Sequence, residues 1–283
     1  MKTFNNFDLT KYNSYRLIAS CDTAYFPDNE EDIISIFNSD GRKIILGNGN
    51  NIILSKKWYD EEFVIFSDCF DKIVVKHSDI TAEAGATMLQ MSEKALEHAL
   101  SGFEVFYDIP SSIGGAVVMN AGSGDEEIKD LLLKVRYLDL SDMEFKEITP
   151  DKMEFEYRNS IFQKKTDKVV MKAWFRLTPG NPEIIKAKME EIKQKRWEKQ
   201  PRNYPNCGSV FKRPSGLFVG PMLDELGLKG FTVGGASISD KHSGFIINSG
   251  FATGENILSL INLVQTRVRE KFGVNLELEQ RII

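Results

Sequence analysis

Two loops of this chain carry residue types that can hold a phosphate group. The first is Leu46-Gly47-Asn48-Gly49-Asn50-Asn51, directly after an apolar run. Glycine lets the backbone turn sharply, and the amide N–H groups of such a turn can converge on an anion. The spacing differs from the GxGxxG of a dinucleotide-binding unit, and no helix clearly follows. The segment suits a pyrophosphate, although a plain turn after a strand explains it as well.

The second loop begins with Ile109-Pro110-Ser111-Ser112-Ile113-Gly114-Gly115 and continues to Asn120-Ala121-Gly122. A proline and two serines before a run of small residues indicate a helix start, where free amides and hydroxyls bind phosphate. The paired glycines would let a cofactor come close, and tight packing of the helix on a neighbour is the alternative. Two such loops in one chain favour a single long ligand with a diphosphate.

Two further segments carry basic side chains. They are Tyr157-Arg158-Asn159-Ser160-Ile161-Phe162 and Asn206-Cys207-Gly208-Ser209-Val210-Phe211-Lys212-Arg213-Pro214. Lys212 and Arg213 could hold a phosphate or a carboxylate. A solvated arginine in the first segment and a surface strand with a basic edge in the second are the alternatives.

The tail from Leu276 to Ile283 begins with strict alternation of apolar and polar residues. In a strand, this pattern places Glu277, Glu279 and Arg281 on one face. Their charges would then be available to a ligand or to solvent on that side.

The elements that must position these segments follow from hydrophobic periodicity. Met88, Met91, Ala95 and Ala99 form one helical stripe, which is typical of core packing. Helices are predicted at Glu30–Phe37, at Thr87–Leu100, between Gly180 and Pro205, and from about Gly254 to Phe272. The third is rich in charge, with Asn181 as its cap and Pro182 in its first turn. The apolar face of the fourth consists of Ile257, Leu260, Ile261, Val264 and Val268. The predicted strands are Lys43–Leu46, Asn51–Leu54, Phe63–Phe66, Ile73–Val75, Leu132–Leu140, Val169–Leu177 and Phe245–Ile247.

The overall composition indicates an ordinary globular protein. Apolar residues make up 42% of the 283 residues and charged residues 27%, and the net charge is −5. This charge gives no electrostatic reason to expect nucleic acid or an anionic membrane as a partner. Three cysteines without a CxxC pair favour a reducing compartment, and no histidine stands in a metal-ligand spacing. With no apolar signal segment or membrane span in the sequence, we expect a cytoplasmic protein without a metal site.

The order of these segments resembles a known enzyme family. The blocks GNGNN, IPSSIGGAVVMNAG, YRNSIF, CGSVFKRP, GLKG with GGASISDKHSGFIIN, and FGVNLELEQRII are similar to successive blocks of the UDP-N-acetylenolpyruvoylglucosamine reductases. The resemblance extends from about Leu46 to Ile283. The short stretch between YRNSIF and CGSVF resembles the shorter subtype, which lacks a substrate-covering insertion.

The resemblance implies a mixed α/β and α+β fold of the PCMH-type FAD-binding class. Two small α/β domains would bind FAD, and a C-terminal α/β domain would bind the substrate. We expect the first domain at residues 1–70, joined by the tail 274–283, the second with its connector helix at 71–200, and the third at 201–273.

The family's activity implies non-covalent FAD, NADPH as hydride donor and a UDP-sugar enolpyruvyl ether as substrate. The enzyme would act in peptidoglycan precursor synthesis, and so in cell wall biogenesis, cell shape, cell cycle and division, as a monomer. By resemblance, Gly47–Asn51 and Ile109–Gly122 bind FAD. Arg158 corresponds to the catalytic arginine, Ser209 to the proton donor and Glu279, two residues before Arg281, to the catalytic glutamate.

Two alternatives stay open at this point. Another FAD oxidoreductase of this fold, such as an alcohol or sugar-acid oxidase, would share the diphosphate loops but lack the set of Arg158, Ser209 and Glu279. A flavin-binding regulator without catalysis is the second alternative. It is suggested by departures from the family pattern at Asn50, at Ser111 and in two short stretches, Tyr15 to Ser20 and Ser123-Gly124-Asp125.

Overall fold

The computed structural model describes residues 1–283, and contacts between residues divide the chain into two compact units. The first unit contains Met1–Phe4, Thr23–Asn48 and Glu61–Arg196, and the second contains Asn5–Asp22, Gly49–Asp60 and Trp197–Ile283. Strands β1 (Lys2–Asp8) and β2 (Ser20–Phe26) therefore pass from one unit into the other. The three-domain division drawn from the sequence stays a prediction.

Parallel strands precede the first loop in the first unit. Strand β6 (Glu62–Ile65) pairs in parallel with β3 (Lys43–Leu46) and with the end of β2. Helix α1 (Glu30–Asn38) is capped by Asn29, whose side chain accepts a hydrogen bond from the amide of Asp32. The predicted strand at Lys43–Leu46 is confirmed, and the predicted strand at Phe63–Phe66 lies one residue earlier.

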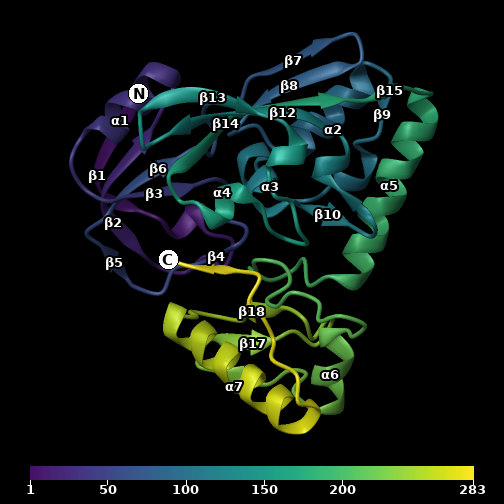
Figure 1. Ribbon diagram of the computed structural model, residues 1–283. Coiled ribbons are helices and arrows are strands. Elements are labelled where there is room, and N and C mark those ends of the chain that lie inside the picture. The colour runs from purple at the N-terminus through teal and green to yellow at the C-terminus, as the bar shows by residue number, and fades with distance from the viewer. The chain divides into compact units, whose positions relative to one another are not determined.

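A five-stranded antiparallel sheet lies in the first unit (Figure 1). Helix α3 (Ile113–Met119) packs on strands β14 and β8 of this sheet. The strands, in sheet order, are β13 (Glu144–Ile148), β12 (Leu132–Asp139), β14 (Lys168–Arg176), β8 (Asp79–Glu83) and β7 (Ile73–Lys76). The sheet confirms the predicted strands at Leu132–Leu140, Val169–Leu177 and Ile73–Val75 to within one residue at each end.

The other helices of the first unit carry clear start and stop signals. Helix α2 (Met88–Glu97) begins with a capping box formed by Thr87 and Gln90. The predicted end at Leu100 is wrong, because Ala99 has a left-handed φ of 52° and Leu100 belongs to a short strand. That strand, β9 (Leu100–Ser101), pairs with β15 (Thr178–Pro179).

Shorter elements complete the first unit. Asn181 Oδ1 accepts a hydrogen bond of 2.8 Å from the amide of Glu183 at the start of α5, so the predicted cap is confirmed. These elements are β10 (Gly122–Ser123), β11 (Glu126–Glu127), α4 (Ile161–Lys164) and α5 (Pro182–Lys199).

Helix α7 (Gly254–Phe272) packs on a three-stranded antiparallel sheet in the second unit (Figure 1). The predicted bounds and apolar face of this helix are confirmed, since Thr253 caps its start and Gly273, in a left-handed conformation, ends it. The sheet strands are β16 (Thr232–Val233), β17 (Ala236–Ile238) and β18 (Ile246–Asn248), and helix α6 (Val219–Glu225) packs against α7.

The C-terminal tail is less regular than the predicted strand. Only β19 (Arg281–Ile282) is a strand, and it pairs in parallel with β4 (Ile52–Ile53). The short strand β5 (Trp58–Tyr59) pairs in parallel with the first residues of β2. The alternation of the tail persists nevertheless, because Leu276 and Gln280 are buried while Glu277 is exposed.

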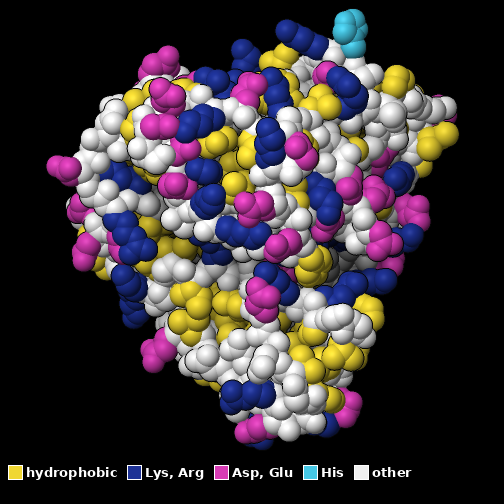
Figure 2. All heavy atoms as spheres, in the orientation of Figure 1, with side chains coloured by type: hydrophobic (Ala, Val, Ile, Leu, Met, Phe, Trp, Pro, Cys, Tyr) yellow, Lys and Arg dark blue, Asp and Glu magenta, His cyan; other side chains and the backbone are white.

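The surface and the thiols carry little specialised chemistry. On the face drawn in Figure 2, acidic and basic side chains are interspersed. No helix combines the length and apolar character needed to cross a bilayer. The cysteines are unpaired, and burial raises the pKa of the Cys21 thiol to about 11 and that of the Cys207 thiol to about 12.

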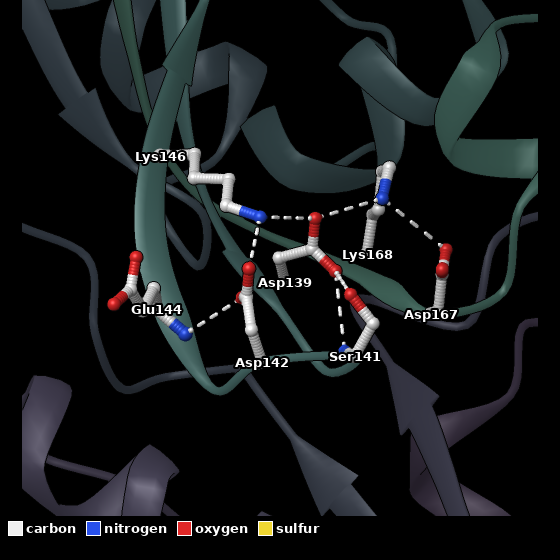
Figure 3. Close-up of polar contacts among 7 residues, drawn as sticks. All are labelled: Asp139, Ser141, Asp142, Glu144, Lys146, Asp167 and Lys168. Carbon is white, nitrogen blue, oxygen red and sulfur yellow. Dashed lines mark hydrogen bonds and ion pairs between the residues drawn. The ribbon is translucent and has the colours of Figure 1, made fainter.

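A buried carboxylate, that of Asp139, ties the edge of the large sheet together (Figure 3). Its Oδ2 accepts hydrogen bonds from Lys146 Nζ at 3.0 Å and Lys168 Nζ at 3.1 Å, and its Oδ1 accepts one from Ser141 Oγ at 2.6 Å. Only 5% of Asp139 is exposed. The bonds from Ser141 and then Lys146 hold the pKa of this carboxyl well below its usual range.

We predict that Asp139→Asn lowers the free energy of unfolding by about 2 kcal/mol at pH 7, because two ammonium groups lose their buried counter-charge. The folded-state pKa is depressed, so this stabilisation is present above the unfolded-state pKa of about 4 and declines as pH falls below it. Urea unfolding of both proteins from pH 7 to pH 3 should show the gap narrowing. Asp142→Asn, which removes a half-exposed partner of Lys146, is the control and should cost much less. A gap that is independent of pH would contradict the assignment.

Candidate active site

The first unit brings the two predicted cofactor loops together at Gly47 and Ser112. Gly47 follows β3 directly, and Ser112 caps α3 through a hydrogen bond from the Gly115 amide to its Oγ. A Cβ atom added at Gly47 would lie 2.5 Å from Ser112 Oγ. A side chain at this position would make the Ser112 hydroxyl or the loop shift, so glycine permits the close approach of the two loops.

The amides at the start of α3 already have acceptors within the chain. Ile113 donates to the carbonyl of Ala86 at 2.7 Å, and Gly114 donates to that of Ala84 at 2.9 Å. The expectation of free amides at this helix start is wrong, because the chain after β8 docks against it. A Cβ at Gly114 would lie 2.9 Å from Ala84 Cβ, so this glycine serves tight packing.

The first loop, by contrast, keeps its amides available. No acceptor within the chain receives a hydrogen bond from the backbone amides of Gly47 to Asn51. In the second unit, Gly49 has a φ of +64°, and a Cβ there would lie 2.0 Å from the carbonyl oxygen of Tyr12. The Asn50 side chain donates to Ser14 Oγ at 2.5 Å, and its buried Oδ1 has no partner.

Asn120, at the end of α3, also carries a buried acceptor without a donor. It is 0% exposed and left-handed at φ 45°. Its Nδ2 donates to Glu127 Oε2 at 2.9 Å and to the carbonyl of Glu156 at 3.0 Å, and these two acceptors fix the orientation of the amide. Its Oδ1 is left without a partner, which is costly unless a ligand supplies a donor.

Arg158 lies against the same end of α3. Its Nη2 donates to the carbonyl of Gly122 at 2.8 Å and its Nη1 to that of Asn120 at 3.2 Å. The guanidinium also lies over the ring of Tyr157, with 4.8 Å between its Cζ atom and the ring centroid. The structure therefore joins the predicted catalytic arginine to the predicted cofactor segment within the first unit.

Ser209 and Glu279 belong to neighbouring extended segments of the second unit. The amide of Glu279 donates to the carbonyl of Val210 at 2.9 Å, and the next bridge pairs Phe211 with Leu278. The carbonyl of Glu279 accepts a hydrogen bond of 3.1 Å from Asn51 Nδ2. Asn51 is thus bonded to Glu279, and Glu279 in turn is bonded to the residue after Ser209.

The basic pair after Ser209 has partners within the chain. Lys212 Nζ forms an ion pair with Glu277 Oε1 at 2.5 Å, and the Arg213 guanidinium lies over the Phe218 ring, 4.7 Å from its centroid. These contacts match the alternative of a basic strand edge. A role of Lys212 and Arg213 in substrate binding stays a prediction.

Sequence reasoning missed three buried polar residues that are linked by hydrogen bonds, one of which, Gln280, donates to the carbonyl of Ser209. They are Tyr15, Asn248 and Gln280, which are 0%, 9% and 2% exposed. A signal for Gln280 was present, because the alternation of the tail places it on the opposite face from Glu279, among residues expected to be buried.

Each predicted cofactor loop, taken by itself, has polar atoms that could bind a ligand. In each unit, one predicted cofactor segment keeps a buried amide oxygen without a donor, at Asn50 in one case and Asn120 in the other. The free amides that follow β3 would suit an anion. No group of three or more His, Cys, Asp or Glu side chains is arranged to hold a metal ion.

Comparison with family models agrees with this arrangement. Residues 22–148 match the model described as an FAD binding domain. Residues 200–283 match that of the UDP-N-acetylenolpyruvoylglucosamine reductase C-terminal domain. The mixed fold of the PCMH-type FAD-binding class that was expected from the sequence is confirmed.

Full-length relatives and one solved structure extend the match. The chain is 41% identical to the UDP-N-acetylenolpyruvoylglucosamine reductase of Caldanaerobacter subterraneus subsp. tengcongensis, over 100% of this chain and 94% of that protein. It is 38% identical to that of Francisella tularensis subsp. tularensis, over 97% and 98%. The crystal structure of UDP-N-acetylenolpyruvylglucosamine reductase from Thermus caldophilus is similar with a TM-score of 0.81 and 27% identity, over 99% of this chain and 98% of that one.

The two alternatives kept open by the sequence are not favoured by these matches, which cover all parts of the chain rather than the cofactor loops alone. The chain belongs to the UDP-N-acetylenolpyruvoylglucosamine reductase family.

Proposed function

We propose that this protein is an FAD-dependent UDP-N-acetylenolpyruvoylglucosamine reductase, which converts the enolpyruvyl ether of a UDP-sugar to UDP-N-acetylmuramate. The observation that carries the proposal is 41% identity along the whole chain to a relative of that name. The position of Arg158 against Asn120 and Gly122 supports it independently, because it joins a cation to a predicted cofactor segment.

We propose that FAD is held, without a covalent bond, by both predicted loops. The loop amides of Gly47–Asn51 would face the diphosphate, and Asn120 Oδ1 would accept a hydrogen bond from the ligand. In the other loop, Ile109, Pro110, Ser111, Ala121 and Gly122 would supply shape. Gly114 keeps α3 close to Ala84, and Gly115 leaves room beside the hydroxyls of Ser111 and Ser112. When bound there, FAD would supply the hydride chemistry that links NADPH to the substrate.

The chemistry assigned to the protein is stabilisation of charge and transfer of one proton. The substrate double bond gains a hydride at its β-carbon and a proton at its α-carbon, and NADPH is oxidised to NADP⁺. Hydride addition moves negative charge towards the substrate carboxylate, where the planar fork of Arg158 would stabilise it. Ser209 would give its hydroxyl proton to the α-carbon, and Glu279 would polarise or orient the carboxylate.

Several finer properties belong to the same proposal. NADPH as the donor, the cytoplasm as the compartment, a monomeric state, and roles in cell shape, cell cycle and division are what the family resemblance implies. An assay of NADPH oxidation that depends on the UDP-sugar enolpyruvyl ether, rather than on oxygen, tests the function. Light scattering during gel filtration tests the oligomeric state.

We predict that Gly47→Ala weakens flavin binding about tenfold or more, because its methyl group would overlap Ser112 Oγ and push the two loops apart. Flavin fluorescence during titration measures the affinity, and melting of the flavin-free protein checks the fold. Gly220→Ala is the control, since the nearest atom to its added Cβ lies 4.0 Å away. Equal affinities for wild type and Gly47→Ala would refute the role of this approach.

Neutralising Lys212 and Arg213 together, as Lys212→Gln/Arg213→Gln, should raise the Michaelis constant for the UDP-sugar roughly tenfold, through loss of charge-assisted hydrogen bonds to its phosphate or carboxylate. Reduction of the bound flavin by NADPH should be unchanged. Lys271→Gln, which breaks a surface ion pair with Glu225, is the control. An unchanged Michaelis constant would return the pair to the basic strand edge.

Ser209→Ala should leave flavin binding and flavin reduction by NADPH intact. Oxidation of the reduced flavin by the enolpyruvyl substrate should slow by roughly a hundred- to ten-thousand-fold, the usual contribution of a positioned acid. Ser209→Cys should recover part of the rate, because a thiol also donates a proton. Stopped-flow measurement of each half-reaction separates the two effects, and equal slowing of both halves would remove Ser209 from the mechanism.

A further inference from the structure

Gln280 forms the centre of a buried hydrogen-bond network in the second unit. Its side-chain Nε2 donates to the carbonyls of Cys207 at 3.2 Å, Gly208 at 3.3 Å and Ser209 at 3.3 Å. Three carbonyls therefore share the two N–H groups of one amide. Because Gln280 is only 2% exposed, water does not readily replace it as their donor.

Tyr15 fixes which end of the Gln280 amide faces these carbonyls. Its hydroxyl donates to Gln280 Oε1 at 2.9 Å, and its own carbonyl accepts a hydrogen bond of 2.9 Å from Asn248 Nδ2. Tyr15 is 0% exposed, and burial raises the pKa of its hydroxyl well above the usual value, so it stays a donor. If the Gln280 amide were flipped, its Oε1 atom would face the carbonyl oxygens of residues 207–209, and these oxygens repel one another.

Space is open around Gly208, the residue before Ser209, although its neighbour Cys207 is buried. Gly208 has a φ of +77°, and a Cβ added there would find no atom within 4 Å. The Gly208 amide donates to Asn206 Oδ1 at 3.1 Å, on the side of the turn away from Ser209. Beyond the turn, Ser209 pairs with Phe245, and the amide of Val210 donates to the carbonyl of Gly244 at 3.1 Å. The bonds from Gln280 add to this pairing and hold the carbonyls of residues 207–209.

The tail changes partners at Gln280. Before it, Glu279 bonds to Val210, and after it the amide of Arg281 donates to the carbonyl of Asn51 at 2.9 Å. The backbone of Gln280 is therefore held by hydrogen bonds of the residues on both sides, which fixes its Cα atom. From this fixed position, the side-chain amide of Gln280 can hold the carbonyls of residues 207–209 in place.

We propose that Gln280, oriented by Tyr15, is a positioning residue for Ser209. It holds the carbonyl row of residues 207–209 and so fixes where the Ser209 hydroxyl stands. The inference rests on the proposed function, in which that hydroxyl gives the proton to the substrate. A displacement of about 1 Å in such a group costs roughly a hundredfold in rate.

The variant Gln280→Met keeps the length of the side chain and removes its amide, and Tyr15→Phe removes only the hydroxyl that orients it. Gln265→Met is the matched control, because Gln265 Nε2 also donates to a carbonyl of the tail, that of Leu276 at 3.0 Å, away from Ser209. Each variant is made in the wild-type chain and in Ser209→Ala, and the flavin-loaded proteins are compared by stopped flow.

We expect Gln280→Met to slow oxidation of the reduced flavin by the UDP-sugar about a hundredfold and to leave reduction by NADPH unchanged. In the Ser209→Ala background it should cause no further slowing, because both changes act on one proton transfer. Tyr15→Phe should show a smaller effect of the same pattern, and Gln265→Met neither effect. Additive slowing, or equal slowing of both half-reactions, would overturn the proposal.

Hydrogen exchange supplies a readout that needs no turnover. Backbone amides of residues 207–210 should exchange faster in Gln280→Met and Tyr15→Phe, and at the wild-type rate in Gln265→Met. Unchanged exchange in both variants would overturn the positioning role, even if Gln280→Met proves too unstable for kinetics and only Tyr15→Phe remains. A wild-type enzyme that binds flavin but does not reduce the substrate would instead overturn the proposed function.

Discussion

The second unit depends on hydrogen bonds that the C-terminal tail makes to two other segments. The amide of Lys212 donates to the carbonyl of Glu277 at 2.9 Å, and the amide of Ile283 donates to that of Ile53 at 3.0 Å. The tail thereby fixes the register of the segment that contains Ser209 and of the strand that follows the first glycine loop. Glu279 lies between these two pairings. Backbone hydrogen bonds on both sides therefore set the position of its Cα atom, whatever its side chain contacts.

Close contacts between backbone segments give the first unit a comparable constraint. The start of α3 sits so near Ala84 that Gly114 has no room for a side chain, and Gly47 meets Ser112 in the same way. Close-packed interiors tolerate few changes of volume at such points. The glycines that suggest a nucleotide-binding loop therefore act partly by letting protein segments approach one another.

Local signals in the sequence predicted the elements better than their partners. Helix α7 was predicted with its observed bounds from its apolar stripe, and in the structure Thr253 caps its start and Gly273 ends it. The end of α2 was missed because Ala99, a good helix former, is left-handed in the structure. Each strand of the β10–β11 hairpin has only two residues, which is too short to show an alternation of apolar and polar residues.

In the candidate site, too, the sequence predicted individual residues better than the contacts between them. Resemblance named Arg158, Ser209 and Glu279, but only the folded chain reveals that Arg158 bonds to Asn120 and Gly122. Alternation in the tail predicted only that Glu277, Glu279 and Arg281 lie on one face. Tyr15, which bonds to Gln280, lies far away in sequence, and no local pattern connects the two. Contacts between distant segments depend on topology, which a single sequence does not express through period or spacing.

The discontinuous second unit has a consequence for how the chain acquires its structure. Its early segments, Asn5–Asp22 and Gly49–Asp60, leave the ribosome long before the stretch from Trp197 onward with which they pair. Contacts between residues so far apart in sequence have an entropic cost of loop closure, and they form slowly. During that interval the strand β4 is an unpaired edge, open to other chains or to chaperones. The first unit's long continuous segment, Glu61–Arg196, can meanwhile fold, so amides there should gain protection ahead of those in β4 when refolding is followed by pulsed hydrogen exchange.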